Sequence, residues 1–257
     1  MALGHPAGTP PHGRGGPGCL RGHQGLHRRT SSMTPTAPEA TEPVGVTPIT
    51  SLADLLAVDG VSEEMEIRSA VGVLAIHGGG LERATDVVAR EVAARTGSSF
   101  YALVQPDGSR RHLPSIRFIP GVSEKLDSFL REVDTVMSIH GYGRHDDFWA
   151  VLVGGANRPL AHHVAGHLRE TLPEEYRVVD DVDAMPRTLR GLHPDNPVNH
   201  PAGGGVQVEL PPSIRWNRDH RDWSDHDGTP RSEHLELLID GLSAAIQDLP
   251  TADETPS

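Results

Sequence analysis

The chain has 257 residues, of which 36% are hydrophobic, and a formal net charge of −12 at pH 7. This length and apolar content suffice for one enzyme-sized domain, and the acidic balance disfavours general nucleic-acid binding. The single cysteine, Cys19, excludes an intrachain disulfide and a thiolate metal cluster, so a metal would depend on carboxylates and on the 16 histidines.

The two ends of the sequence differ in composition from its middle. The first 32 residues contain four Arg and four His but no Asp or Glu, and they are rich in Gly and Pro, so they cannot bury a core. We predict a disordered leader at 1–45, one folded domain at 46–250 and a disordered tail at 251–257. No stretch has the apolar length of a signal-peptide core or of a membrane span. We therefore expect a cytoplasmic protein without a membrane partner.

Apolar runs alternate with helical periods, which is typical of β and α units stacked around a parallel sheet. The predicted strands are residues 71–76, 100–105, 116–119, 135–139, 149–153, 176–179 and 206–210, and the predicted helices are 51–57, 82–95, 123–133, 159–172 and 232–249. Segment 180–205 is a long loop, and long loops in compact domains are usually functional or disordered. The predicted fold class is α/β, a single domain with a mostly parallel mixed sheet flanked by helices.

Three side chains suited to metal binding follow predicted strands, where sheets of this kind hold their sites. In AIHGGGLE, His77 ends one strand, and the three glycines allow a tight turn that brings Glu82 toward it. In SIHGYG, His140 ends another strand. Two imidazoles and one carboxylate form an open zinc set. The alternatives are a phosphate-binding or purely structural turn, with Glu82 favoured by the helix dipole alone.

The other histidines give weaker signals. His163 and His167 are spaced i, i+4 on a predicted helix, but HHVAGH lacks the glutamate of the metalloprotease motif. A place beside the apolar side of a packed helix is the simpler interpretation. His220 and His226 lie in NRDHRDWSDHDG, which we interpret as a solvated loop.

A zinc hydrolase also needs a general base that is not a strong metal ligand. Glu209 fits this role because it interrupts the apolar strand VQVEL, which two prolines close. The alternative is a solvent-facing residue on an edge strand, since Gln207 and Glu209 alternate with apolar positions.

The stretches AIHGGGLE, SIHGY, GGANRPLA and NPVNHPAGGGVQVELPPSIR occur in this order within residues 70–249. Together they resemble the poly-γ-glutamate hydrolase family, zinc peptidases of phages and bacteria with a zinc carboxypeptidase-like fold. The resemblance implies a zinc hydrolase domain in which His77, Glu82 and His140 bind zinc. It also implies that Glu209 is the catalytic base and the later proton donor.

The resemblance implies an anionic substrate, a γ-linked glutamate chain, whose carboxylates suit guanidinium partners. Arg158 and Arg215 lie beside the matched stretches and are the candidates, although each is equally typical of a surface arginine. Two rival interpretations stay open. One is a small-molecule amidohydrolase for acyl-glutamate or acyl-aspartate. The other is a non-catalytic module in which HGGGLE binds a phosphate, for which Arg83 is the cation nearest the glycines.

Overall fold

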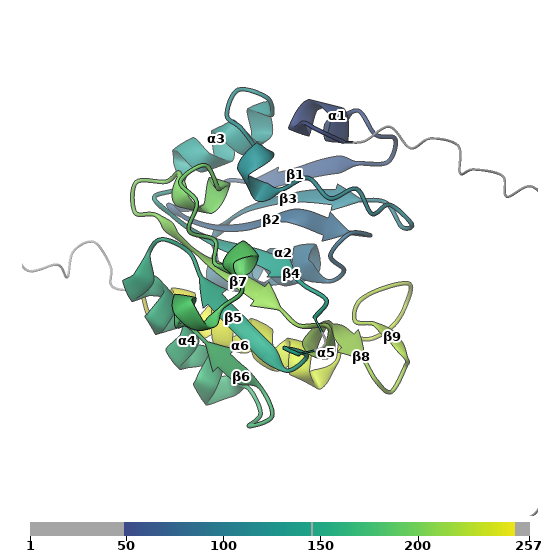
Figure 1. Cartoon of the computed structure of the whole chain (residues 1–257), viewed down its shortest axis with the longest axis vertical. Helices are drawn as coiled ribbons and strands as arrows, with labels where there is room; N and C mark the ends of the chain where they lie inside the picture. Colours follow the sequence, from purple (N-terminus) through teal and green to yellow (C-terminus); the bar gives the residue numbers. More distant parts are fainter. Residues whose placement is uncertain (1–48, 145, 250–257) are drawn as a thin grey trace, which may run out of the picture. The chain divides into compact units, whose positions relative to one another are not determined.

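The computed structural model describes residues 49–144 and 146–249, so the predicted leader 1–45 and tail 251–257 lie outside the described residues. The described residues belong to one compact unit built around a seven-stranded sheet of order β1-β3-β2-β4-β7-β5-β6 (Figure 1). The strands are β1 (Ser62–Glu66), β2 (Val71–Gly79), β3 (Ser99–Gln105), β4 (Thr135–Gly141), β5 (Ala150–Gly154), β6 (Arg177–Val179) and β7 (Gly205–Leu210).

The middle of the sheet is parallel, and its outer part contains two reversals. Strands β3, β2, β4 and β7 pair in parallel, whereas β1 is antiparallel to β3 and β5 is antiparallel to β7. Strand β6 pairs in parallel with β5. The mostly parallel mixed sheet is therefore confirmed. Because of these directions, β2, β4 and β7 end on the same side of the sheet, and β5 ends on the opposite side.

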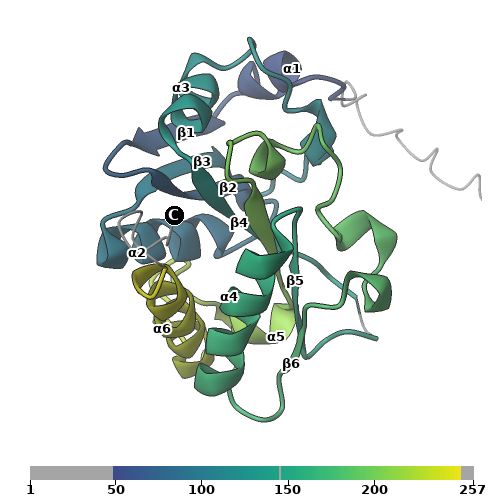
Figure 2. The ribbon, with the colours of Figure 1, turned by 90° about the vertical axis from the view of Figure 1, so that its left-hand side faces the viewer.

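Helices cover both faces of the sheet. Helices α2 (Thr85–Thr96), α4 (Arg158–Thr171) and α6 (Glu233–Gln247) pack together on one face, as Figure 2 shows. Helices α1 (Leu52–Leu56) and α3 (Glu124–Glu132) contribute to a second core on the other face. Alternation of strand side chains fills both cores, since Val73 and Ala75 of β2 face the first, whereas Leu74 and Ile76 face the second.

Strand β7 divides its side chains in the same way. Val206, Val208 and Leu210 belong to the core under α2, α4 and α6, so Gln207 and Glu209 point to the opposite face. That face is covered by the loop that joins β6 to β7, which forms three short 3₁₀ turns, η2 (Val182–Ala184), η3 (Arg187–Leu189) and η4 (Pro197–Asn199). All six residues of β7 are buried as a result.

Four local predictions were wrong or incomplete. Strand β1 was not predicted, because SEEME is polar and half-exposed at an edge of the sheet. Residues 116–119 form no strand, because Pro114 precedes a 3₁₀ turn, η1 (Ser115–Arg117), that buries Phe118 alone. Helix α2 begins three residues later than predicted, because Ala84 has a φ of 70°. The predicted solvated loop contains a small two-stranded sheet, β8 (Trp216–Asn217) with β9 (Asp222–Trp223).

No helix in the described part of the chain is long and apolar enough to cross a membrane.

We expect Gly79→Ala to destabilise the fold more than Gly97→Ala. Both glycines have a φ of +67°, so both substitutions carry the left-handed cost of roughly 1–2 kcal/mol. A Cβ on Gly79 would lie 2.2 Å from the Gln105 carbonyl oxygen, whereas one on Gly97 would meet nothing within 4 Å. Unfolding in denaturant should show a further loss of about 1–3 kcal/mol for Gly79→Ala. Equal losses in the two variants would contradict the close approach of β2 to β3.

Candidate metal centre

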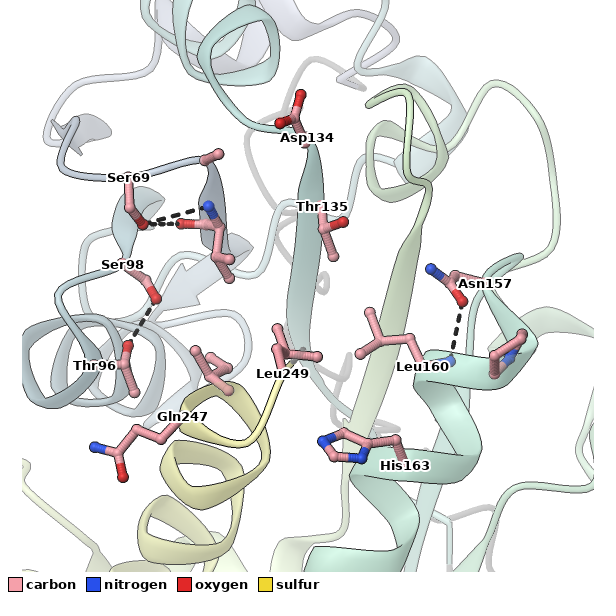
Figure 3. Close-up of a pocket in the computed structure, with 14 residues that line it drawn as sticks. Ser69, Thr96, Ser98, Asp134, Thr135, Asn157, Leu160, His163, Gln247 and Leu249 are labelled. Carbon is pink, nitrogen blue, oxygen red and sulfur yellow. Dashed lines mark hydrogen bonds between the residues drawn. The ribbon is translucent and has the colours of Figure 1, made fainter. Parts of the chain in front are cut away.

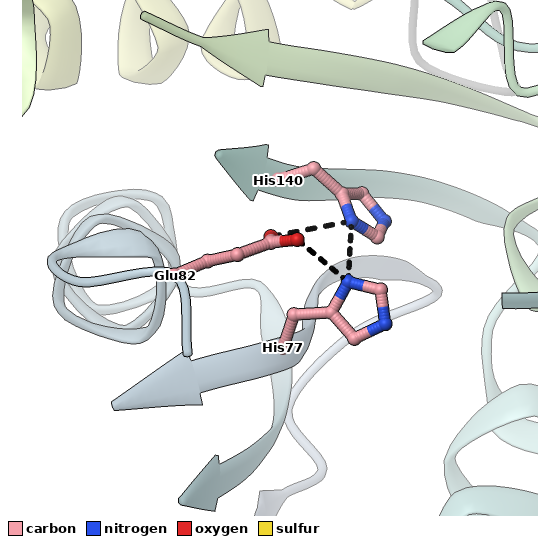
Figure 4. A group of neighbouring side chains, drawn as sticks. All are labelled: His77, Glu82 and His140. Atoms are coloured by element: carbon pink, nitrogen blue, oxygen red, sulfur yellow. Dashed lines mark hydrogen bonds and ion pairs between the residues drawn. The ribbon is translucent and has the colours of Figure 1, made fainter. Parts of the chain in front are cut away.

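His77, Glu82 and His140 converge at the carboxyl ends of two neighbouring strands (Figure 4). His77 lies near the end of β2, at a register shift between Ala75 and Gly78, and His140 lies near the end of β4. The His77 Nδ1 atom is 3.2 Å from His140 Nδ1 and 2.8 Å from a Glu82 carboxylate oxygen. The other Glu82 oxygen is 3.5 Å from His140 Nδ1. The structure thus brings together all three predicted ligands.

These separations fit a tetrahedral zinc ion. Ligand atoms bonded at 2.0–2.1 Å in tetrahedral geometry are about 3.3 Å apart. The His77 Nε2 atom lies 2.9 Å from the Leu113 carbonyl oxygen, which can only accept a proton. Nε2 therefore carries the hydrogen, and the Nδ1 lone pair of His77 faces the centre of the cluster. The donor set also fits zinc chemically, since imidazole nitrogen and carboxylate oxygen are its common ligands.

Glu82 lies in the turn before α2, not in the first helical turn, so the helix-dipole alternative does not explain it. One of its oxygens accepts a 2.8 Å hydrogen bond from the Gly141 backbone N–H. Burial opposes ionisation of this carboxyl, but the charges and hydrogen bonds of His77 and His140 outweigh burial and lower its pKa. Burial likewise lowers the pKa of His77, but Glu82 reverses the effect and raises it overall. The cluster therefore favours an ionised Glu82.

Glu209 lies next to this cluster on the neighbouring strand. It pairs in register with His140 and is 3% exposed, so it is not a solvent-facing edge residue. One carboxylate oxygen accepts a 2.7 Å hydrogen bond from Gln207 Nε2. Burial, only partly offset by the charge of His140, raises the pKa of Glu209 to about 7. A carboxyl in this range can both accept and return a proton near neutral pH.

Arg215 is buried beside the cluster. Its guanidinium donates to the carbonyl oxygens of Arg83 and Tyr142 at 3.0 and 2.9 Å and lies 5.1 Å from the centroid of the Trp223 ring. Burial lowers the pKa of Arg215 to about 10, although the charges of Glu82 and Glu209 oppose the shift. The residue thus reaches the site, but two of its nitrogens already hold backbone carbonyls.

A cavity of about 260 Å³ opens at this point of the molecule. It is lined by Glu82 together with three arginines, Arg83, Arg110 and Arg215. Arg83 pairs with Asp107 at 3.0 Å, whereas Arg110 has no polar partner among the described residues. Arg110 was not among the residues predicted from the sequence, where the cationic run SRRH after a turn was its only signal.

Arg158 is not brought to this site. It begins α4 after β5, and β5 runs antiparallel to β7, so Arg158 lies at the other end of the sheet. Its guanidinium donates to the backbone carbonyls of Val153, Gly155 and Asp180. The residue serves the fold at that end of the sheet.

The same opposite end holds a larger cavity, of about 880 Å³ (Figure 3). Asn157, His163 and Leu249 are among its lining residues. His163 also belongs to a second group of potential ligands with His167 and Asp248, but His163 Nε2 already meets the Ala245 carbonyl oxygen at 2.8 Å. Asp248 has a side chain that is 73% exposed. This packing against α6 agrees with the simpler interpretation of the two histidines.

Sequence comparison identifies the family of the chain. The model of the poly-gamma-glutamate hydrolase family matches residues 54–227, which is more than half of the chain. The chain belongs to the poly-gamma-glutamate hydrolase family. The match includes His77, Glu82, His140 and Glu209, and it ends before helix α6.

Two curated relatives of the chain come from Bacillus subtilis strain 168. The UPF0714 protein YndL is 31% identical over 153 residues, which are 58% of this chain and 56% of YndL. The SPbeta prophage-derived UPF0714 protein YoqZ is 32% identical over 146 residues, which are 54% of this chain and 47% of YoqZ. The chain thus matches about half the length of each relative.

Two solved structures have the same fold as this chain. A bacteriophage poly-gamma-glutamate hydrolase superposes with a TM-score of 0.62 and 24% identity, covering 76% of this chain and 92% of the phage protein. A zinc-free apo form of YndL superposes with a TM-score of 0.61 and 22% identity, covering 74% of this chain and 90% of YndL. At these identities the two superpositions establish the fold.

Proposed function

We propose that this chain is a zinc-dependent hydrolase that cleaves an amide bond next to glutamate, with a γ-linked glutamate chain as its substrate. The observation that carries the proposal is the convergence of His77, Glu82 and His140 beside the buried carboxyl of Glu209. Membership of the poly-gamma-glutamate hydrolase family supports the substrate class. The zinc-free form described for YndL supports zinc as the metal.

The cluster would hold zinc through Nδ1 of His77, Nδ1 of His140 and the Glu82 carboxylate. A zinc ion held there would supply Lewis acidity, which can polarise a carbonyl and make a water more acidic. The Leu113 carbonyl keeps His77 in the tautomer that binds metal, and the Gly141 N–H holds the Glu82 carboxylate in place.

Glu209 would act as the proton shuttle. Its ionised carboxylate takes a proton from the attacking water and later gives it to the leaving amine. One of its oxygens is held by Gln207, and among the described residues no hydrogen bond reaches the other. That second oxygen is therefore the one that can exchange the proton.

The arginines of the adjoining cavity would bind the carboxylates of the substrate. Arg110 is the lining guanidinium without a polar partner among the described residues, and Arg215 adds a buried positive charge beside it. A planar guanidinium binds carboxylate with two parallel hydrogen bonds. A cationic cavity beside the cluster thus favours an anionic substrate.

The phosphate-binding alternative is disfavoured by the turn itself. The Gly79 N–H donates to Asp86 at 2.9 Å and the Gly80 N–H donates to the Gln105 carbonyl at 2.8 Å. A carboxylate thus already occupies the position that a phosphate would need. The acyl-amino-acid alternative uses the same metal site on a monomer, so turnover of γ-linked polymer against N-acyl-glutamate distinguishes it from the proposal.

We expect His77→Ala, Glu82→Ala and His140→Ala each to lower the zinc content of the purified protein far below that of the wild type, because each removes one of three ligands. Metal analysis of the purified, folded proteins measures this. His112→Ala is the matched control, since its ring lies 5.0 Å from that of His77 but outside the cluster. Full zinc content in all three ligand variants would refute the site.

We expect Glu209→Gln to reduce turnover on the order of 10²-fold or more with zinc content unchanged, because it keeps the side-chain shape and removes the basic oxygen. Glu132→Gln, on the exposed side of α3, is the control and should be silent. Wild-type rates in a zinc-loaded Glu209→Gln protein would defeat the shuttle role. A joint loss of zinc and activity would instead make Glu209 a fourth ligand.

We expect Arg110→Ala to raise the KM for γ-linked glutamate polymer about tenfold, which corresponds to about 1.4 kcal/mol, with kcat nearly constant. The reason is that the substrate carboxylates would lose this partner equally in the bound ground state and in the transition state. Arg117→Ala, an exposed arginine on η1, should leave KM unchanged. An unchanged KM in Arg110→Ala would remove this arginine from the binding site.

A further inference from the structure

A chain of three buried side chains leads from the β6–β7 loop to Glu209. Asn196, Gln207 and Glu209 are each less than 5% exposed. Asn196 Nδ2 donates to Gln207 Oε1 at 2.8 Å, and Gln207 Nε2 donates to Glu209 Oε1 at 2.7 Å. Both contacts are short and lie on the face of β7 that the loop covers.

The direction of this chain is fixed at its far end. The Asn196 side-chain oxygen accepts from the backbone N–H of Val198 at the start of η4. A backbone N–H can only donate, so the Asn196 amide must turn its NH₂ group toward Gln207. Gln207 then offers its oxygen to Asn196 and its own NH₂ group to Glu209. Each link determines the orientation of the next.

The backbone around Gln207 leaves little room for another arrangement. Gly191 in the same loop has a φ of +65°, and a Cβ there would lie 2.8 Å from the Gln207 Cβ atom. Gln207 Nε2 also lies 3.5 Å from the Leu189 carbonyl oxygen. The loop therefore approaches Gln207 closely enough to hold its amide in one place.

We infer that Asn196 and Gln207 are positioning residues for Glu209, an inference that rests on the proposed function of Glu209. Gln207 holds one oxygen of the carboxylate and so directs the other oxygen toward the metal cluster. Asn196 acts through Gln207, because it determines which end of the Gln207 amide faces Glu209. The long β6–β7 loop thus contributes to the reaction through Gln207.

Asn196→Asp provides the sharpest test. The carboxylate has no N–H to donate, so Gln207 must reverse its amide and place an oxygen against the Glu209 carboxylate. We expect kcat on γ-linked glutamate polymer to fall about 10- to 100-fold, with KM and zinc content nearly constant. Gln207→Met, which keeps the length of the side chain but removes the donor, should lower kcat similarly.

The double variant separates positioning from general stability. If Asn196 acts through Gln207, Asn196→Asp should have no further effect on kcat in the Gln207→Met background, whereas independent structural effects would multiply. Asn157→Asp is the matched control, because Asn157 also donates to a backbone carbonyl, that of Gly203, and its side-chain oxygen caps α4, but it lies at the opposite end of the sheet from Glu209. It should keep wild-type kcat per folded molecule. Multiplying effects, or an equal loss of kcat in Asn157→Asp, would overturn the inference.

Two further comparisons keep the outcome unambiguous. The Gln207 side-chain amide resonances in NMR spectra, assigned by their absence from Gln207→Met, should move in Asn196→Asp and stay in Asn157→Asp, whether or not a substrate is turned over. If they do not move in Asn196→Asp, the inference is wrong. An inactive Glu209→Gln beside fully active Gln207→Met and Asn196→Asp variants would refute the inference alone. A fully active Glu209→Gln would refute the proposed function and the inference together.

Discussion

The Glu82 carboxylate joins two strands at a point where their backbones no longer pair. The ladder between β2 and β4 ends at Leu74 and Ser138, before either strand reaches its histidine. Beyond that point Glu82 accepts from the Gly141 N–H of β4 and faces His77 of β2. The pairing of β2 with β4 does not continue there, and the Glu82 side chain contacts both strands instead. The position of His140 relative to His77 depends on this bridge.

Other parts of the site are arranged around the same bridge. A Cβ on Gly141 would lie 2.7 Å from the Arg215 guanidinium carbon, so the absence of a side chain there lets Arg215 approach. The Glu209 carboxyl, two imidazoles and one guanidinium are buried together, with the Glu82 carboxylate partly buried among them. Burying any of them alone would be costly, because an uncompensated charge in a protein interior loses its hydration. Their mutual proximity offsets part of that cost, and the same proximity concentrates reactive groups.

Much of this arrangement could be predicted from sequence, since buried strands followed by His77 and His140 have a clear pattern. What the sequence could not show was strand direction. Arg158 follows a strand and two glycines much as Glu82 does, yet β5 runs opposite to β7 and takes Arg158 to the other end of the sheet. Nor could alternation reveal that the polar side of β7 is covered, because the covering loop is distant in sequence. The alternative of solvent-facing positions for Gln207 and Glu209 therefore stayed open.

The edges of the sheet bear on how copies of the protein behave toward one another. An unpaired strand edge offers free N–H and C=O groups to a second copy, which promotes aggregation. In this sheet one edge is β1, with three glutamates within five residues, and the other is β6, only three residues long. The glutamates of β1 disfavour pairing with the β1 strand of a second copy. Strand β6 is too short to form many hydrogen bonds with another strand. Within the described residues, both edges of the open sheet thus have features that disfavour its extension between molecules.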